Sequence, residues 1–103
     1  MTRYLCSELV VLKRGETDTI VNLEEIWSDG AAIEMDDGVE IGKQVELVCQ
    51  ENRLAGKIAG AEKHEFGWRI ELKFLPATRW SPEVFRPQHM IDPDDLPGKK
   101  SPA

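Results

Sequence analysis

The sequence predicts an all-β protein, a closed antiparallel barrel of six short strands. Apolar and polar residues alternate with a period of two along much of the first 75 residues. Turn-forming residues interrupt this alternation at short intervals, and no helical crossover separates the runs. This pattern is typical of an antiparallel barrel or sandwich. With six strands we favour the barrel, because closure removes exposed strand edges.

The segment 67–75 is the clearest strand. Its apolar set is Trp68, Ile70, Leu72 and Phe74, and its polar set is Arg69, Glu71 and Lys73. Each set falls on one face, so this strand has one face on a core and one in water. Weaker alternation or apolar runs predict the others, and the six expected strands cover residues 3–12, 18–27, 31–35, 43–50, 53–62 and 67–75.

Turn signals fall between these strands. Gly or Asn occurs in each of them and supplies the positive φ that tight turns require. The expected turns lie at 13–16, 28–30, 36–38, 41–43, 51–52 and 64–67. We therefore expect one barrel domain over residues 1–75.

After residue 75 the composition changes, because all six prolines of the chain occur from Pro76 onward. No regular strand persists at that density, so residues 76–103 are expected to form an extension packed on the barrel. Ser81 and Pro82 resemble a helix start, with room for at most one turn before Pro87. The expected anchors are Trp80, Phe85, Met90, Ile91 and Leu96, and residues 98–103 are expected to be mobile.

The formal net charge of −6 argues against broad affinity for nucleic acids or anionic membranes. The charge is unevenly distributed. Residues 1–51 contain four basic and twelve acidic residues, whereas residues 53–86 contain seven basic and four acidic ones. A local basic face within residues 53–86 could hold one small anionic ligand. The alternative is a solvated sheet surface with charges of both signs. Separately, Arg69, Lys73 and Lys57 are expected to share an outer face of the barrel.

Cys6 and Cys49 lie in apolar, strand-like runs and are expected in or near the core. The chain shows no zinc-site spacing, no secretory signal pattern and no apolar run long enough to cross a membrane. We therefore expect a cytoplasmic protein without a metal or a resident cofactor.

No catalytic arrangement is evident. The adjacent carboxylates Glu24 and Glu25, like Asp36 and Asp37, are expected to point to opposite sides of a strand, so that neither pair converges on one atom. Nucleophile motifs and phosphate-binding loops are also missing. The sequence favours a binding module over an enzyme.

The segment 20–34 is the most informative. A strand ending at Trp27 meets a Ser28-Asp29-Gly30 turn and is followed by the apolar residues 31–33. This places a carboxylate and a hydroxyl at a strand end, and the glycine permits a sharp bend or close approach to a ligand. Trp27 beside the turn could serve as an exposed platform. An ordinary hairpin turn is the alternative interpretation.

Three further pieces complete a pattern in the same order along residues 3–75. Gly42–Leu47 has the form G-x-x-V-x-L and Gly67–Phe74 the form Gly-aromatic-x-Ile-x-Leu-x-Phe. Between them, Gly56-Lys57-Ile58 corresponds to a G-x-V piece, with Ile in place of Val. In order and spacing the chain resembles PilZ domains. The resemblance implies a six-stranded barrel that acts in bacterial signalling, with cyclic di-GMP as the expected ligand.

PilZ domains bind that ligand through an Arg-x-x-x-Arg segment and an Asp/Asn-x-Ser-x-x-Gly motif. Aligned on Gly30, Glu25 falls at the acidic position and Trp27 at the serine position, while a one-residue slip would offer Ser28. Arg3 falls near the second arginine, and the first has no counterpart. The resemblance thus implies an incomplete site of Arg3, Glu25, Trp27, Ser28 and Gly30.

We therefore expect a PilZ-like signalling domain that acts mainly through a protein partner. The alternative is a small β-barrel of another family that binds nucleic acid or serves as a general interaction module. Nucleic-acid binding is disfavoured, because the aromatic residues of 67–75 alternate onto the face opposite the basic ones.

Overall fold

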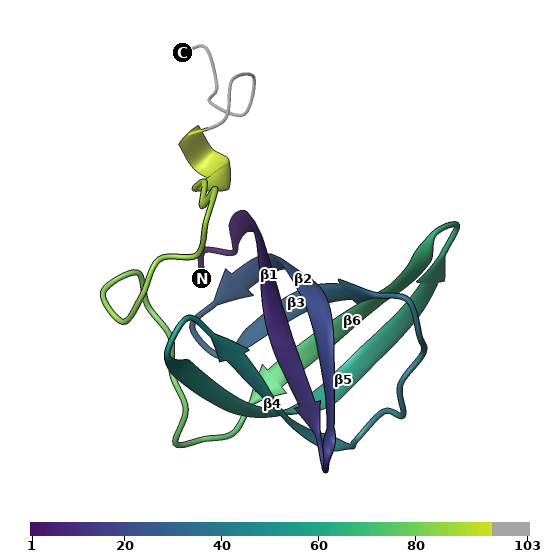
Figure 1. Ribbon diagram of the computed structural model, residues 1–103. Coiled ribbons are helices and arrows are strands. Elements are labelled where there is room, and N and C mark those ends of the chain that lie inside the picture. The colour runs from purple at the N-terminus through teal and green to yellow at the C-terminus, as the bar shows by residue number, and fades with distance from the viewer. Residues whose placement is uncertain (96–103) are drawn as a thin grey trace.

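The computed structural model describes residues 1–95 and shows a closed barrel of six antiparallel strands (Figure 1). The strands are β1 (Tyr4–Arg14), β2 (Thr17–Trp27), β3 (Gly30–Met35), β4 (Gln44–Cys49), β5 (Asn52–His64) and β6 (Gly67–Phe74). Around the barrel their order is β1-β2-β3-β6-β5-β4. The predicted all-β barrel is confirmed, and every strand boundary lies within two residues of its expected position.

The core lies inside the barrel and follows the period of two. On β6, Ile70, Leu72 and Phe74 are buried, as the alternation predicts. Trp68 on the same face is only partly buried and packs against the edge of the core. Cys49 is buried and Cys6 partly buried, so both thiols lie where the sequence analysis placed them.

Two-residue turns close several hairpins. Gly15 adopts a left-handed φ of 59° between β1 and β2, as expected of glycine. Between β4 and β5 the residue with positive φ is Gln50, at 58°, whereas the expected turn residue Asn52 already begins β5. Backbone closure of the hairpin, rather than side-chain preference, therefore places Gln50 in this conformation.

Three strands contain register irregularities. They occur between Leu5 and Glu8 on β1, between Leu23 and Glu25 on β2, and between Ile58 and Gly60 on β5. A bulge adds a residue to one strand and interrupts the alternation of faces. On β2 this lets Leu23 and Ile26, three residues apart, both point into the core.

The extension completes the barrel. β1 pairs with β4 only over residues 11–13, which leaves the beginning of β1 as an open edge. The extension covers it, because Leu5 and Ile91 exchange backbone hydrogen bonds of 2.9 and 2.7 Å, and the Ser7 amide donates to the Gln88 carbonyl at 3.0 Å. An edge strand covered in this way is protected from pairing with other chains.

The expected helix start at Ser81 forms a single turn, in which the Val84 amide donates to the Ser81 carbonyl at 2.9 Å. Proline density prevents continuation, and the helix found in the described part of the extension is the 3-10 turn η1 (Pro93–Asp95). Leu96 and residues 98–103 lie outside the described residues. Within residues 1–95, no helix has the length and apolar character needed to cross a bilayer.

Candidate functional site

Arg3 and Trp27 form the centre of the candidate site. Arg3 immediately precedes β1 and Trp27 ends β2, and the Arg3 guanidinium carbon lies 3.9 Å from the centroid of the Trp27 ring. Trp27 is only 5% exposed, so it is not the open platform that the sequence suggested. The arginine instead covers the ring in a cation–π contact.

Gly30 makes room for this ring. It begins β3 directly opposite Trp27, and a Cβ placed on it would lie 2.7 Å from the indole and 2.6 Å from the Leu72 carbonyl oxygen. Separations below 3.0 Å are essentially never seen for real Cβ atoms. Only glycine fits at position 30, because a larger residue would clash with the Trp27 ring and with the backbone of β6. The Trp27 ring therefore occupies the space beside Gly30 in which a ligand could otherwise lie.

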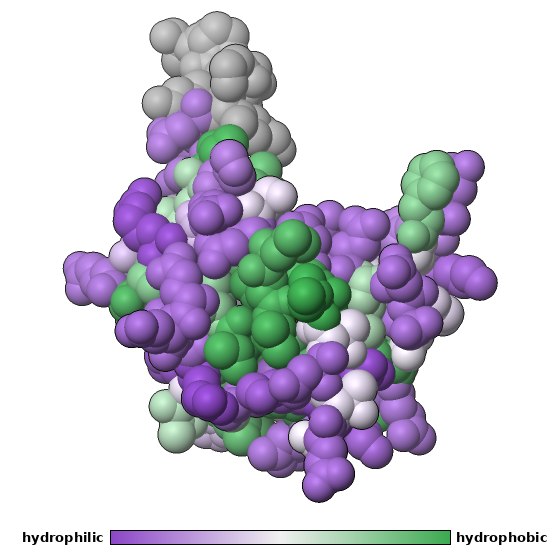
Figure 2. Space-filling view, viewed as in Figure 1, coloured by the Kyte–Doolittle hydropathy of each residue, from purple (hydrophilic) through white to green (hydrophobic). Residues whose placement is uncertain are grey.

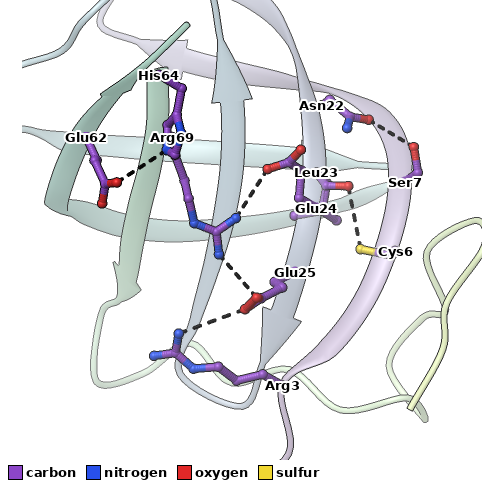
Figure 3. A network of polar contacts seen from close by, with 10 residues as sticks. All are labelled: Arg3, Cys6, Ser7, Asn22, Leu23, Glu24, Glu25, Glu62, His64 and Arg69. Carbon is purple, nitrogen blue, oxygen red and sulfur yellow. Dashed lines mark hydrogen bonds and ion pairs between the residues drawn. The ribbon is translucent and has the colours of Figure 1, made fainter. Parts of the chain in front are cut away.

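Glu25 lies between two arginines (Figure 3). Its carboxylate is 3.1 Å from Nη2 of Arg69 on β6 and 3.9 Å from Nη1 of Arg3. Arg3 also donates to Glu71 at 3.0 Å. Each arginine is thus matched by carboxylates, and Glu25, with only 16% of its side chain exposed, is the most buried charged side chain of the network.

Glu24 binds the same guanidinium as Glu25, with its Oε1 3.3 Å from Nη1 of Arg69. The expectation that these adjacent side chains point to opposite sides of the strand was therefore wrong, and each carboxylate binds a different nitrogen of the same guanidinium. The bulge between Leu23 and Glu25 is the physical reason, because it places both side chains on the outer face of β2.

The environment of Glu24 raises its pKa above the ordinary value of 4.5. Burial against the barrel wall is the largest cause, the neighbouring Glu34 adds to it, and the positive charge of Arg69 opposes it. The network therefore holds one carboxyl group whose ionised form is disfavoured by folding.

We expect Glu24→Gln to gain stability relative to the wild-type protein as the pH rises from about 4 to about 7. The folded-state pKa is raised, so the folded protein binds more protons than the unfolded chain in this window. Wild-type stability arising from Glu24 is present below the unfolded pKa and is lost as the pH rises. Urea unfolding of both proteins across the range measures the difference. The matched control is Glu51→Gln in the exposed turn after β4, and a Glu24→Gln difference that stays flat or reverses with pH would contradict the expectation.

Ser28 is separated from the other predicted site residues. It lines a different hollow with Tyr4, Trp80 and Pro82, and its carbonyl accepts a hydrogen bond of 3.0 Å from the Trp80 amide. The bulge that would have had to bring Ser28 into the site lies upstream of Glu25 instead. The structure thus brings together Arg3, Glu25, Trp27 and Gly30.

The hollow beside the Arg3–Trp27 stack has a volume of about 220 Å³. Its lining also includes residues outside the predicted site, namely Asp29, Ala59, Glu71, Leu72 and Lys73. One sequence signal could have revealed part of the network. The spacing of Leu23 and Ile26 breaks the period of two, which is typical of a bulge.

Both thiols of the described residues are at least partly shielded by burial. Burial, followed by the charge of Glu8, raises the pKa of Cys49 to about 12, and burial likewise raises the pKa of Cys6 to about 12. Both thiols stay protonated at neutral pH, which makes them poor nucleophiles. Within residues 1–95 no three His, Cys, Asp or Glu side chains gather to hold a metal ion.

Comparison with known proteins does not assign this barrel to a family. No protein-family model matches the chain, and no curated protein matches it significantly.

Proposed function

We propose that this chain is a non-enzymatic, PilZ-like signalling domain that acts through contact with a protein partner and does not bind cyclic di-GMP tightly. The proposal rests on the resemblance within residues 3–75 together with the six-stranded barrel. The observation that carries it is the closed network at the motif position, where Arg3 is engaged by Trp27, Glu25 and Glu71.

This network disfavours a nucleotide phosphate. A guanidinium binds phosphate well when its donors are free, but Arg3 already has two carboxylate neighbours at 3.0 and 3.9 Å. A phosphate approaching this point would also meet the negative charges of Glu25 and Glu71. Trp27 offers no hydroxyl in place of a motif serine, and its ring face is covered.

An apolar strip on the outer faces of β1, β2 and β4 supports a protein partner. Val11 on β1 is paired directly with Ile20 on β2 and with Val48 on β4, and Leu9 lies two residues along β1. Leu9 is 72% exposed and Ile20 is 71% exposed. Figure 2 shows apolar side chains gathered at the centre of the face over β1, within a polar surround.

Paired charges border this strip. Lys13 lies 3.0 Å from Asp18, and Arg53 lies 2.8 Å from Glu46. An apolar centre with a polar rim is the usual anatomy of a protein–protein interface. Since these rim charges neutralise one another, they favour a partner that presents an apolar surface over one recognised by charge.

The test has two arms. In the first, a photo-crosslinking amino acid replaces Leu9 in the strip or Phe66, which is 83% exposed at the β5–β6 turn far from it. We expect a discrete protein adduct in native cells from position 9 and none from position 66. Adding Ile20→Glu to the position-9 variant should abolish the adduct and leave the far-UV circular dichroism spectrum of the folded protein unchanged. Equal adducts from both positions, or none from position 9, would overturn the protein-contact proposal.

The second arm is calorimetry with cyclic di-GMP. We expect no saturable heat at ligand concentrations up to about 1 mM, which corresponds to a binding free energy weaker than about −4 kcal/mol. Micromolar binding that Arg3→Ala removes would show that the network opens for the ligand, and it would refute the incomplete-site interpretation.

A further inference from the structure

A second cluster of positive charge lies on the barrel wall formed by β5 and β6. Lys57 and Lys73 are direct cross-strand partners on the outer face, and both are exposed. Among the described residues neither forms an ion pair. Like charges placed directly opposite one another destabilise a sheet, so this pair is a local cost to the fold.

Arg79 brings a third cation from the extension to the same place. Its Nη1 donates to the carbonyls of Thr78 at 2.9 Å and Leu75 at 3.5 Å, which holds the guanidinium without neutralising it. Together with Lys57 and Lys73 it lines a hollow of about 360 Å³. The remaining lining is Asp29, Phe74, Leu75 and Pro76.

The net charge of the residues that line this hollow is opposite in sign to that of the whole chain. Three cations and one carboxylate line it, in a protein whose formal net charge is −6. Features that break a local rule of stability without a structural gain are expected at functional sites. An excess of about two positive charges matches a dianion, and a guanidinium beside two ammonium groups suits the oxygens of a phosphate.

The other side of the hollow is apolar. Phe74, Leu75 and Pro76 line it, and its volume falls in the range of small-molecule pockets, about 300–1,000 Å³. Cations on one side and apolar groups on the other fit a ligand with a charged and an organic part. We propose that this hollow binds a small organic phosphate monoester, with the phosphate between Lys57, Lys73 and Arg79 and the organic group against Leu75 and Pro76.

This site goes beyond the proposed function and does not depend on it. The apolar strip is centred on β1, which in the closed barrel is separated from β6 by β2 and β3 and from β5 by β4. The hollow is also distinct from the Arg3–Trp27 stack, although Asp29 and Lys73 line both cavities. Loss of one activity can therefore be measured while the other persists.

Phenyl phosphate and inorganic phosphate are the probes, titrated at low salt up to about 10 mM while backbone amide resonances are followed. We expect phenyl phosphate to bind at least about tenfold more tightly than phosphate, because only the ester reaches the apolar side. The largest shifts should fall on the amides of residues 57, 73–75 and 79. Equal affinity for the two probes, no binding of either, or shifts confined to residues 3 and 27 would each overturn the proposal.

Variants separate this site from general electrostatic attraction. Lys73→Gln and Lys57→Gln should each weaken phenyl phosphate at least about tenfold. The matched control, Lys63→Gln, removes the same charge from β5 but at the end near Trp68, 5.9 Å from its ring, and should leave binding unchanged. If all three variants weakened phenyl phosphate binding equally, the binding would be non-specific electrostatic attraction, and the proposed site would be wrong.

Thermal melting adds a readout that distinguishes binding from a structural role. Without ligand, Lys57→Gln should raise the melting temperature by about 2–4 °C, because the repulsion with Lys73 is removed. Saturating phenyl phosphate should raise the melting temperature of the wild-type protein more than that of the variant. The difference in melting temperature between the two proteins should therefore disappear. A variant that melts lower without ligand would mean that the lysine pair supports the fold rather than a ligand.

Discussion

Replacement of Trp80 by alanine is expected to lower the free energy of unfolding by about 3–5 kcal/mol. Trp80 belongs to the extension, yet it is 3% exposed and part of the barrel core. Its ring makes edge contacts with Tyr4 at 5.5 Å and Phe85 at 6.1 Å, and its Nε1 donates to the Phe85 carbonyl at 3.1 Å. The alanine variant loses this packing and leaves that carbonyl without its indole donor. Urea unfolding followed by far-UV circular dichroism measures the loss.

The matched control is Phe66→Ala, which removes an aromatic ring that is 83% exposed. That change should alter the free energy of unfolding by no more than about 0.5 kcal/mol. If Trp80→Ala lowered the free energy of unfolding no more than Phe66→Ala does, the extension would not belong to the cooperative folding unit. The fold supports the opposite expectation, since backbone bonds from Gln88 and Ile91 also cover the open edge of β1.

Gly30→Ala is expected to destabilise the protein by about 2–3 kcal/mol, although it adds only one methyl group. The new Cβ would lie 2.6 Å from a backbone oxygen of β6, which cannot move without disturbing the strand pairing. It would also meet the Trp27 ring at 2.7 Å and displace the partner on which Arg3 stacks. Chemical denaturation reports the stability, and the indole N–H resonance of Trp27 reports the displaced ring.

Gly60→Ala on β5 serves as the control for the same added atom. There the nearest neighbour of the new Cβ is the Glu71 Cβ at 3.8 Å, an ordinary contact. Alanine should be tolerated there, because it also costs less conformational entropy than glycine on folding. Similar stability of the two variants would mean that β3 and β6 can separate, which would contradict the tight packing at Gly30.

The sequence predicted part of the candidate site for a local reason. Trp27 and Gly30 lie at the two ends of one turn, so their proximity follows from the hairpin itself. Arg69 and Glu71 could not be assigned from sequence, because their contacts with Glu25 and Arg3 span 44 and 68 residues. Ser28 was grouped with the site from its position in the motif, but the fold directs it toward the extension.

Alternation and turn signals together predicted six antiparallel strands with an apolar interior, because a period of two shows which side chains of a strand are buried. Proline density alone placed the end of the last strand near residue 75. Only the tertiary structure decided that Glu24 and Glu25 share Arg69, that Trp27 is covered, and that Lys57 faces Lys73. These features depend on bulges and on strand register, which arise from pairing between distant segments and leave little trace in the local pattern.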